Sequence, residues 1–255
     1  MLKIAVHGIC GKMGEITARM ISERKDMSLA FGIDPFAGEA PEGVRVYKSV
    51  EEVPESEKCD VIIDFSNFKA VPALLSFAVS RKIPVVVCTT GLDAETKRQL
   101  VESASTVPVF HSANMSMGIA LMRVLAAKAA AVLGDSFDIE IVERHHNRKI
   151  DAPSGTAIML ADAIDTVWDG RYDYVFDRHS RTEKRSKYEI GISSVRGGNI
   201  VGDHEVIFAG ENEVIELTHR AQSREVFAEG AIKAAVFLAD KDRGIYTMDD
   251  LVGGF

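Results

Sequence analysis

Residues 140–156 gather side chains that suit proton transfer to a small anion. Two adjacent histidines, His145 and His146, end a run of alternating apolar residues, and Lys149 follows shortly after. An imidazole gains and loses its proton near neutral pH, so it can act as a general acid or base. In an extended chain, His145 and Lys149 would point to the same side and converge on one ligand. The segment therefore predicts a site that holds an anion and moves a proton.

The residues after the histidines predict the start of a helix. Ser154, Gly155 and Thr156 follow a proline, and a serine there can cap a helix whose first backbone amides are free. Free amides and the helix dipole favour a bound carboxylate. The alternative is a charged loop in which Ser154 only caps the helix.

The first half of the chain predicts the scaffold for a second ligand. Short apolar runs alternate with amphipathic stretches, which is typical of a parallel sheet covered by helices on both faces. The expected strands are 3–6, 29–33, 61–65, 85–87 and 107–110, and the expected helices are 12–24, 71–81 and 94–103.

The second half is organised differently. Helices are expected at 115–133, 156–168 and 223–238, and closely spaced strands at 188–195, 205–209 and 213–218. Strands this close in sequence indicate an antiparallel or mixed sheet. The predicted fold class is α/β, with an N-terminal Rossmann-type parallel sheet domain and an α+β substrate domain that contains a mixed sheet.

A glycine-rich turn between the first strand and helix predicts a nicotinamide dinucleotide site. Gly8, Gly11 and Gly14 allow a tight turn and bring a pyrophosphate close to the helix amides. Asp34 ends the second strand, where a carboxylate accepts hydrogen bonds from the adenosine ribose. That carboxylate repels a 2′-phosphate, although Lys12 can offset the repulsion. NADH is therefore expected to serve at least as well as NADPH.

Two further segments follow predicted strands and can contribute to the same site. Cys88–Gly91 and Ser112–Met115 lie where the carboxyl ends of parallel strands are expected, and ligands gather at that edge of such sheets. The alternative for the first segment is a plain turn, whereas the second can be a hinge between domains and a cofactor contact at once.

Composition limits the partners. The net charge of −8 argues against nucleic acid as the main ligand. The three cysteines show no metal-binding spacing, so no metal is expected. They are expected to be free thiols in a reducing compartment. No signal peptide and no run of about 20 apolar residues is recognised, so a cytoplasmic protein without a membrane partner is expected. The basic stretch 178–187 either attracts an anionic substrate or is a solvated loop.

The segment from Glu140 to Thr156 resembles the 4-hydroxy-tetrahydrodipicolinate reductase family, also called dihydrodipicolinate reductases, through its pattern E-x-x-E-x-H-H-x-x-K-x-D-A-P-S-G-T. The resemblance spans nearly the whole chain. It also includes the glycine turn and the segments 64–66, 89–91, 114–118, 194–204 and 218–220.

This resemblance implies a reaction and an architecture. The family reduces a cyclic unsaturated imine dicarboxylate to tetrahydrodipicolinate with NADH or NADPH, on the diaminopimelate and lysine pathway. It implies a dinucleotide-binding domain made of residues 1–116 with 222–255, and a substrate-binding and oligomerisation domain made of 117–221. Family members are usually homotetramers joined through the sheet of the second domain.

The resemblance also implies residue roles. His145 would donate and accept the proton, Lys149 would be a second donor, and the substrate carboxylates would bind at His146, Ser154, Gly155 and Thr156. Cofactor contacts would come from Gly8, Ile9, Cys10, Gly11, Lys12, Met13, Asp34, Cys88, Thr89, Thr90, Ser112, Ala113, Asn114 and Met115.

Three residues depart from the family pattern. His7 precedes the glycine turn where small residues are common, Cys88 stands where glycine is common, and Ala120 replaces a frequent asparagine.

Two other functions stay open at this point. One is a different nicotinamide dehydrogenase of small dicarboxylates, although a semialdehyde dehydrogenase would need a cysteine that residues 89–255 lack. The other is a dinucleotide sensor without catalysis, which would not need the histidine segment.

Overall fold

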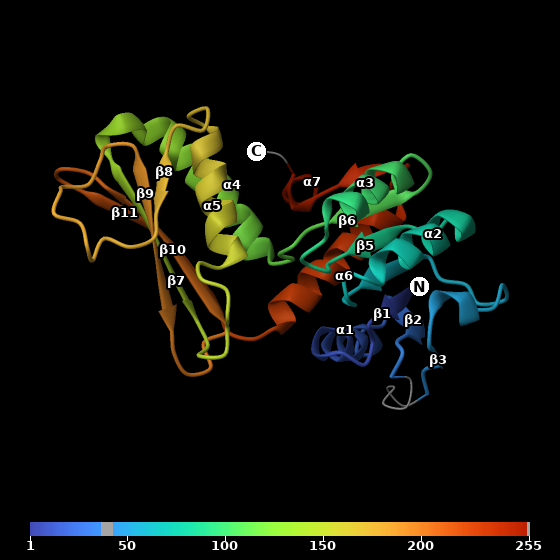
Figure 1. Ribbon diagram of the computed structural model, residues 1–255. Helices are drawn as coiled ribbons and strands as arrows, with labels where there is room; N and C mark the ends of the chain where they lie inside the picture. Colours follow the sequence, from blue (N-terminus) through green and yellow to red (C-terminus); the bar gives the residue numbers. More distant parts are fainter. Residues whose placement is uncertain (37–42, 254–255) are drawn as a thin grey trace. The chain divides into compact units, whose positions relative to one another are not determined.

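The computed structural model describes residues 1–36 and 43–253, and the chain divides into two compact units (Figure 1). The first unit contains Met1–Met117 and Arg224–Phe255, so its sequence is interrupted by the second unit, Gly118–Ser223. Each unit has its own sheet.

The first unit is built on a seven-stranded sheet whose pairings are all parallel. Its order is β12-β6-β5-β4-β1-β2-β3. The strands are β1 (Leu2–His7), β2 (Met27–Ile33), β3 (Val46–Tyr47), β4 (Val61–Asp64), β5 (Val85–Val87), β6 (Pro108–His111) and β12 (Gly244–Tyr246). The predicted parallel sheet is confirmed; β3 and β12 were not predicted because two or three residues carry no readable periodicity.

Helices bury this sheet. They are α1 (Lys12–Ser22), α2 (Val71–Arg81), α3 (Ala94–Ser103), α6 (Glu225–Ala239) and α7 (Met248–Val252), with a 3₁₀ turn, η2, at Val50–Glu52. One core joins alternate strand residues such as Ala5, Ile62 and Val85 to α2 and α3. Helix α6 packs against α1 and against β4, β5 and β6. From β1 the chain runs outward to β2 and β3 and then returns to β4, so the strand order reverses between β1 and β4.

The second unit contains a five-stranded mixed sheet of order β11-β10-β7-β9-β8. Strand β10 is antiparallel to β7 and β11, whereas β7, β9 and β8 run parallel. The strands are β7 (Asp138–His145), β8 (Asp173–Val175), β9 (Glu189–Arg196), β10 (Gly202–Ala209) and β11 (Val214–Ala221). The predicted mixed sheet is confirmed, with β8 as an additional edge strand.

Helices α4 (Met117–Leu133) and α5 (Gly155–Thr166) share the core of this unit with the sheet, and a 3₁₀ turn, η3 (Gly134–Ser136), leads from α4 toward β7. Strand β7 alternates strictly between half-buried and buried residues. Ile139 and Ile141 belong to the core, and the same face continues to Glu143 and His145. Strand periodicity therefore carries a carboxylate and an imidazole into the interior.

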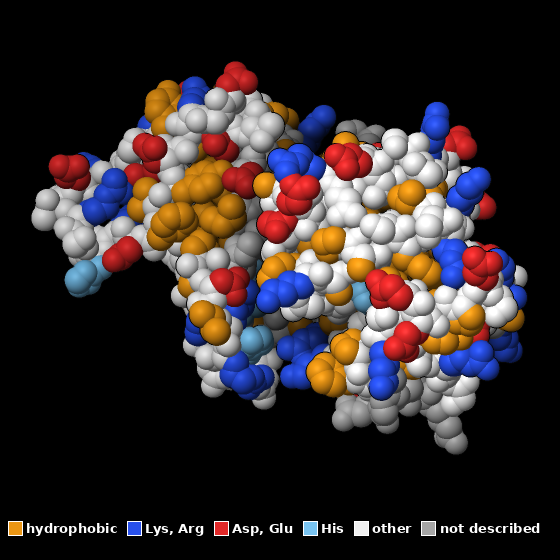
Figure 2. Space-filling view, turned by 45° about the vertical axis from the view of Figure 1, so that its right-hand side comes forward, with side chains coloured by type: hydrophobic (Ala, Val, Ile, Leu, Met, Phe, Trp, Pro, Cys, Tyr) orange, Lys and Arg blue, Asp and Glu red, His pale blue; other side chains and the backbone are white. Residues whose placement is uncertain are grey.

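Helix α4 corrects one expectation. Residues Met117–Ser136 form a helical segment of 20 residues that is long and apolar enough to cross a membrane by length and composition. A core helix can pass the same test, and Ile119, Met122 and Ala126 of α4 pack in the core of the second unit. Leu121 and Leu125 are exposed on the same helix, and hydrophobic side chains gather on one face of this unit (Figure 2).

Candidate active site

The centre of the site in the second unit is a carboxylate with no exposed surface. Glu143 is 0% exposed, and both of its oxygens accept hydrogen bonds from the Arg196 guanidinium at 2.7 Å. Burial alone raises the pKa of such a group, but hydrogen bonds from Arg196 and His145 outweigh it and lower the pKa of Glu143 to about 2. Glu143 is thus a fixed negative charge in the interior.

Glu143 orients the histidine that was predicted to transfer a proton. The Nδ1 atom of His145 lies 2.6 Å from Glu143 Oε2. Because an ionised carboxylate only accepts, Nδ1 carries the hydrogen of this bond and Nε2 is the other functional atom of the ring. A Cβ at Gly202 would lie 3.0 Å from His145 Nε2, so a glycine at that position leaves the ring its room.

A second imidazole, His204, packs edge-on against His145, with ring centroids 5.1 Å apart. Ser154 Oγ lies 2.9 Å from His204 Nε2 and accepts a hydrogen bond from Ala157 N. Burial, followed by the charge of His145, lowers the pKa of His204 to about 3. His204 is therefore a neutral side chain that packs beside His145.

Ser154 has hydrogen-bond partners within the protein. Its hydroxyl caps α5 and bonds to His204, and its backbone N–H donates to Glu143 Oε1 at 3.1 Å. Both polar groups are engaged within the protein. The next residue differs: Gly155 is exposed, and a Cβ there would meet no atom within 4 Å. The first amides of α5 are the part of this segment that fits a carboxylate.

The backbone between His145 and Lys149 differs from the predicted one. Strand β7 ends at His145, and a turn at Asn147 and Arg148 closes with Lys149 N donating to His146 O at 3.1 Å. The extended chain assumed for residues 145–149 is therefore wrong. The Lys149 ammonium pairs with Asp151 at 2.7 Å, and its charge is one of those that lower the pKa of His204.

The glycine turn of the first unit fits a dinucleotide pyrophosphate. Gly8 adopts a left-handed φ of +78°, and a Cβ there would lie 2.7 Å from Phe65 O, so no other residue suits the turn. Gly11 precedes α1 without any side-chain cap. The first amides of the helix therefore remain for an anion. The residues present are those that a dinucleotide site requires.

Asp34 is brought directly to this turn. It is buried, and its two oxygens accept hydrogen bonds from Cys10 N at 3.1 Å and Phe36 N at 2.9 Å. The carboxylate thus lies where the second strand meets the glycine turn. Ile9 is fully buried beneath the turn, whereas Lys12 is exposed.

The remaining predicted cofactor residues follow the carboxyl ends of β5 and β6. Thr89 is buried, Thr90 and Ala113 are exposed, and Ser112 bonds to Asn114 O at 2.7 Å in a tight turn. Cys88 and Met115 are buried. Burial, followed by the charge of Asp64, raises the pKa of the Cys88 thiol well above its usual value, so Cys88 is a neutral packing residue.

The basic stretch 178–187 is an ion-pair network rather than a free cationic surface. Arg178 bonds to both Glu140 and Glu189, Arg181 bonds to Glu189, and Arg185 bonds to Glu140. The buried Glu189 carboxylate has its pKa lowered to about 2, because the hydrogen bonds from Arg178 and Arg181 exceed the effect of burial. These arginines are occupied in fastening the β8–β9 loop to the sheet.

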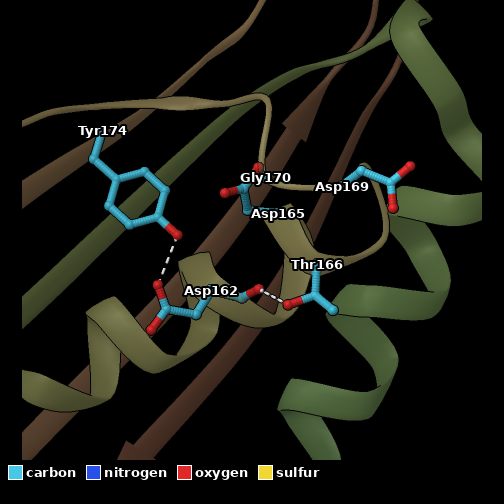
Figure 3. Close-up of a pocket in the computed structure, with 6 residues that line it drawn as sticks. All are labelled: Asp162, Asp165, Thr166, Asp169, Gly170 and Tyr174. Atoms are coloured by element: carbon cyan, nitrogen blue, oxygen red, sulfur yellow. Dashed lines mark hydrogen bonds between the residues drawn. The ribbon is translucent and has the colours of Figure 1, made fainter.

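An acidic pocket of about 440 Å³ lies at the other end of α5 (Figure 3). Asp162, Asp165 and Asp169 line it, and Tyr174 donates to Asp162 at 2.7 Å. Helix α5 has 12 residues, so its two ends are about 18 Å apart. Three carboxylates repel a dianion, so the lining of this pocket does not suit a dicarboxylate.

Three residues of the site were given no site role from the sequence: Glu143, Arg196 as its partner, and His204. The alternation that places Ile139 and Ile141 inside also places Glu143 inside, and this signal was readable. Register completes the group, because Glu143 pairs with His204 across β10 and His145 pairs with Arg196 across β9. Cross-strand register cannot be read from one sequence.

Comparison with known proteins covers both units. The family model described as "Dihydrodipicolinate reductase, N-terminus" matches residues 2–115, and "Dihydrodipicolinate reductase, C-terminus" matches residues 118–252. A 4-hydroxy-tetrahydrodipicolinate reductase from Caldanaerobacter subterraneus subsp. tengcongensis is 50% identical, covering 99% of this chain and 98% of that protein. One from Clostridium novyi is 45% identical, covering 99% and 98%.

A solved structure is also similar. The dipicolinate-bound dihydrodipicolinate reductase from Paenisporosarcina sp. TG-14 superposes with a TM-score of 0.80 at 25% identity, covering 97% of each chain.

The low pKa of His204 generates a prediction about stability. The unfolded chain binds a proton on this imidazole at its usual pKa near 6.5, whereas the folded protein does so at about 3. Between these values the unfolded state holds more protons, so the free energy of unfolding falls as pH falls, by at most about 1.4 kcal/mol per pH unit from this group. His204→Gln should make the fall between pH 6 and 4 shallower in urea titrations. The exposed His179→Gln is the control, and equal slopes in both variants would contradict the assignment.

Proposed function

The chain belongs to the dihydrodipicolinate reductase family, and from that membership we infer its reaction. It reduces 4-hydroxy-tetrahydrodipicolinate to tetrahydrodipicolinate with NADH or NADPH, in the diaminopimelate and lysine pathway. The observation that carries this conclusion is the match at 50% identity over 99% of the chain. The two units take different parts in the proposal: the first binds the dinucleotide, and the second binds the substrate.

The dinucleotide, when bound, supplies the hydride that adds to an electrophilic ring carbon. We propose that the amides at the start of α1 hold its pyrophosphate and that Asp34 accepts from its adenosine ribose. Asp34 supports this role because it lies against Cys10 of the glycine turn. Its negative charge disfavours a 2′-phosphate, so the proposed preference is NADH at least as good as NADPH.

A proton must reach the enamine or the nitrogen that the hydride leaves behind. We propose His145 as the donor and acceptor of this proton and Lys149 as a second donor. Glu143 supports the role of His145: it fixes the ring through Nδ1, which leaves Nε2 for the substrate. A carboxylate behind a histidine also stabilises the imidazolium when the ring is protonated.

The substrate carries two carboxylates, and the second unit offers groups to bind them. The proposed contacts are the amides of Gly155 and Thr156 at the start of α5, with His146 and the ammonium of Lys149. The exposed backbone of Gly155 supports this proposal. Ser154 contributes indirectly, because it holds α5, Glu143 and His204 in place.

We further propose that the protein is a cytoplasmic homotetramer assembled through the second unit. The exposed side chains of Val195 and Val214, on β9 and β11, support an interface on this sheet. Light scattering of the purified protein measures the mass, which should be four times that of one 27.8 kDa chain.

The proposed reaction is tested with substrate generated in the assay by the preceding condensation enzyme. Oxidation of NADH and of NADPH is followed separately at 340 nm, a wavelength set by the cofactor. NADH should give a kcat/KM at least equal to that of NADPH. Binding of NADH without any turnover would support a dinucleotide sensor, and turnover of a different dicarboxylate alone would support another dehydrogenase.

Substitution of the proposed proton donors should lower turnover and spare dinucleotide binding. Positioned general acids contribute roughly 10²–10⁴-fold, so His145→Gln and Lys149→Ala should each reduce kcat by at least about 100-fold. NADH affinity, measured by calorimetry, should stay within about twofold because neither residue lies in the first unit. Near-normal kcat in both variants would exclude these roles.

Glu143→Gln tests whether the buried carboxylate acts through His145. The amide keeps the volume but cannot accept from His145, Arg196 and Ser154 together, so kcat should fall by roughly 10–100-fold, as expected for an orienting group. Glu205→Gln is the matched control, since it also pairs with an arginine, Arg144, on the same sheet. An unchanged kcat and pH profile in Glu143→Gln would remove Glu143 from the mechanism.

A further inference from the structure

A second buried carboxylate, Asp64, lies at the edge of the first sheet where the strand order reverses. His7 ends β1 and Asp64 ends β4, and the two residues are register partners on neighbouring strands. The reversal between β1 and β4 is the place where open parallel sheets form their ligand crevice. His7 is 6% exposed and Asp64 is 0% exposed.

Three donors from three different segments converge on this carboxylate. His7 Nδ1 lies 2.8 Å from Asp64 Oδ1, and Ser66 N donates to the same oxygen at 3.2 Å. Thr89 Oγ1 donates to Oδ2 at 2.7 Å. A buried carboxylate without partners is costly, and these bonds to a charged acceptor are correspondingly strong.

The donors belong to the segments that surround the dinucleotide turn. Gly8 follows His7 directly, and a Cβ on Gly8 would lie 2.8 Å from Ser66 Cα. The Ser66 amide that Asp64 holds is thus part of the surface on which the glycine turn packs. Thr89 follows β5, on the other side of β4. Asp64 therefore ties together the loops after β1, β4 and β5.

We propose that Asp64 is a positioning residue for the dinucleotide, acting through Thr89 and the 65–66 segment, and that His7 is its third anchor. The proposal rests on the proposed function, since it assumes that the first unit binds NADH or NADPH. It also accounts for His7, a residue that departs from the family pattern. The histidine supplies a hydrogen bond that a small residue at this position cannot make.

The network also determines how Thr89 meets a ligand. Its hydroxyl has one hydrogen, and that hydrogen is directed to Asp64. Towards a bound molecule Thr89 Oγ1 therefore acts as an acceptor, so it favours a donor group such as an amide. Without Asp64 the Thr89 hydroxyl could rotate, and its oxygen would no longer be held as an acceptor for the ligand.

A double-mutant cycle on cofactor binding tests the proposal. Asp64→Asn and Thr89→Val should each raise the Kd of NADH, measured by isothermal titration calorimetry, by about tenfold, as for a lost hydrogen bond to a charged or oriented group. The double variant should bind about as weakly as the weaker single variant, because both changes break the same chain of contacts. Thr89→Ser should restore nearly normal affinity, which a general loss of packing would not allow.

Controls separate this proposal from the function on which it rests. Asp60→Asn, an exposed carboxylate of the same unit that bonds to Lys3 N, should leave the Kd unchanged. If Asp64→Asn does not fold, His7→Ala and the two Thr89 variants decide, with an increase of about threefold expected for His7→Ala. Wild-type protein that binds neither NADH nor NADPH would refute the proposed function. Wild-type binding with unchanged affinity in the Asp64 and Thr89 variants, or additive losses in the double variant, would refute the positioning role alone.

Discussion

Burial of the Glu143 carboxylate is the constraint around which the second unit is arranged. An ionised group that has lost its water must be compensated by donors, and four of them reach Glu143 from β7, β9 and the α5 N-terminus. Arg196 supplies the counter-charge in a forked geometry. The position of His145 and the start of α5 follow from satisfying this one group. Replacing Arg196 would leave the buried charge without its counter-charge.

The first unit also buries carboxylates, and their hydrogen-bond donors are main-chain amides and the side chains of His7 and Thr89, without an arginine. Asp34 and Asp64 both accept main-chain amides beside the glycine turn. The central strands β4 and β5 are short and apolar up to Asp64, the last residue of β4. Their polar side chains therefore begin at the carboxyl edge of the sheet, because the positions before it are buried. The same constraint explains why candidate cofactor residues were predicted after these strands.

Most of the architecture could be predicted from periodicity. Apolar runs such as 61–63 and 85–87 read as parallel strands, and the alternation of residues 139, 141, 143 and 145 reads as a half-buried strand. The short strands β3, β8 and β12, of two or three residues each, could not be predicted from the sequence, because the pairing with neighbouring strands decides where they form. The extended chain predicted from His145 to Lys149 is wrong, because a turn at residues 147–148 interrupts it. His204 and Arg196 join the site through register, which depends on the whole sheet.

Helix α5 links two regions of opposite electrostatic character. Its N-terminus carries the positive end of the helix dipole and follows the segment that contains Lys149 and the site histidines. Its C-terminal turn and the loop that follows carry Asp162, Asp165 and Asp169, with no basic residue in the last turn. Carboxylates at the negative end of a helix weaken it by several tenths of a kcal/mol each. The electrostatic potential therefore changes along α5 from positive at its N-terminus to negative at its C-terminus. This difference repels a dianion from the C-terminal end and attracts it to the N-terminal end before any hydrogen bond forms.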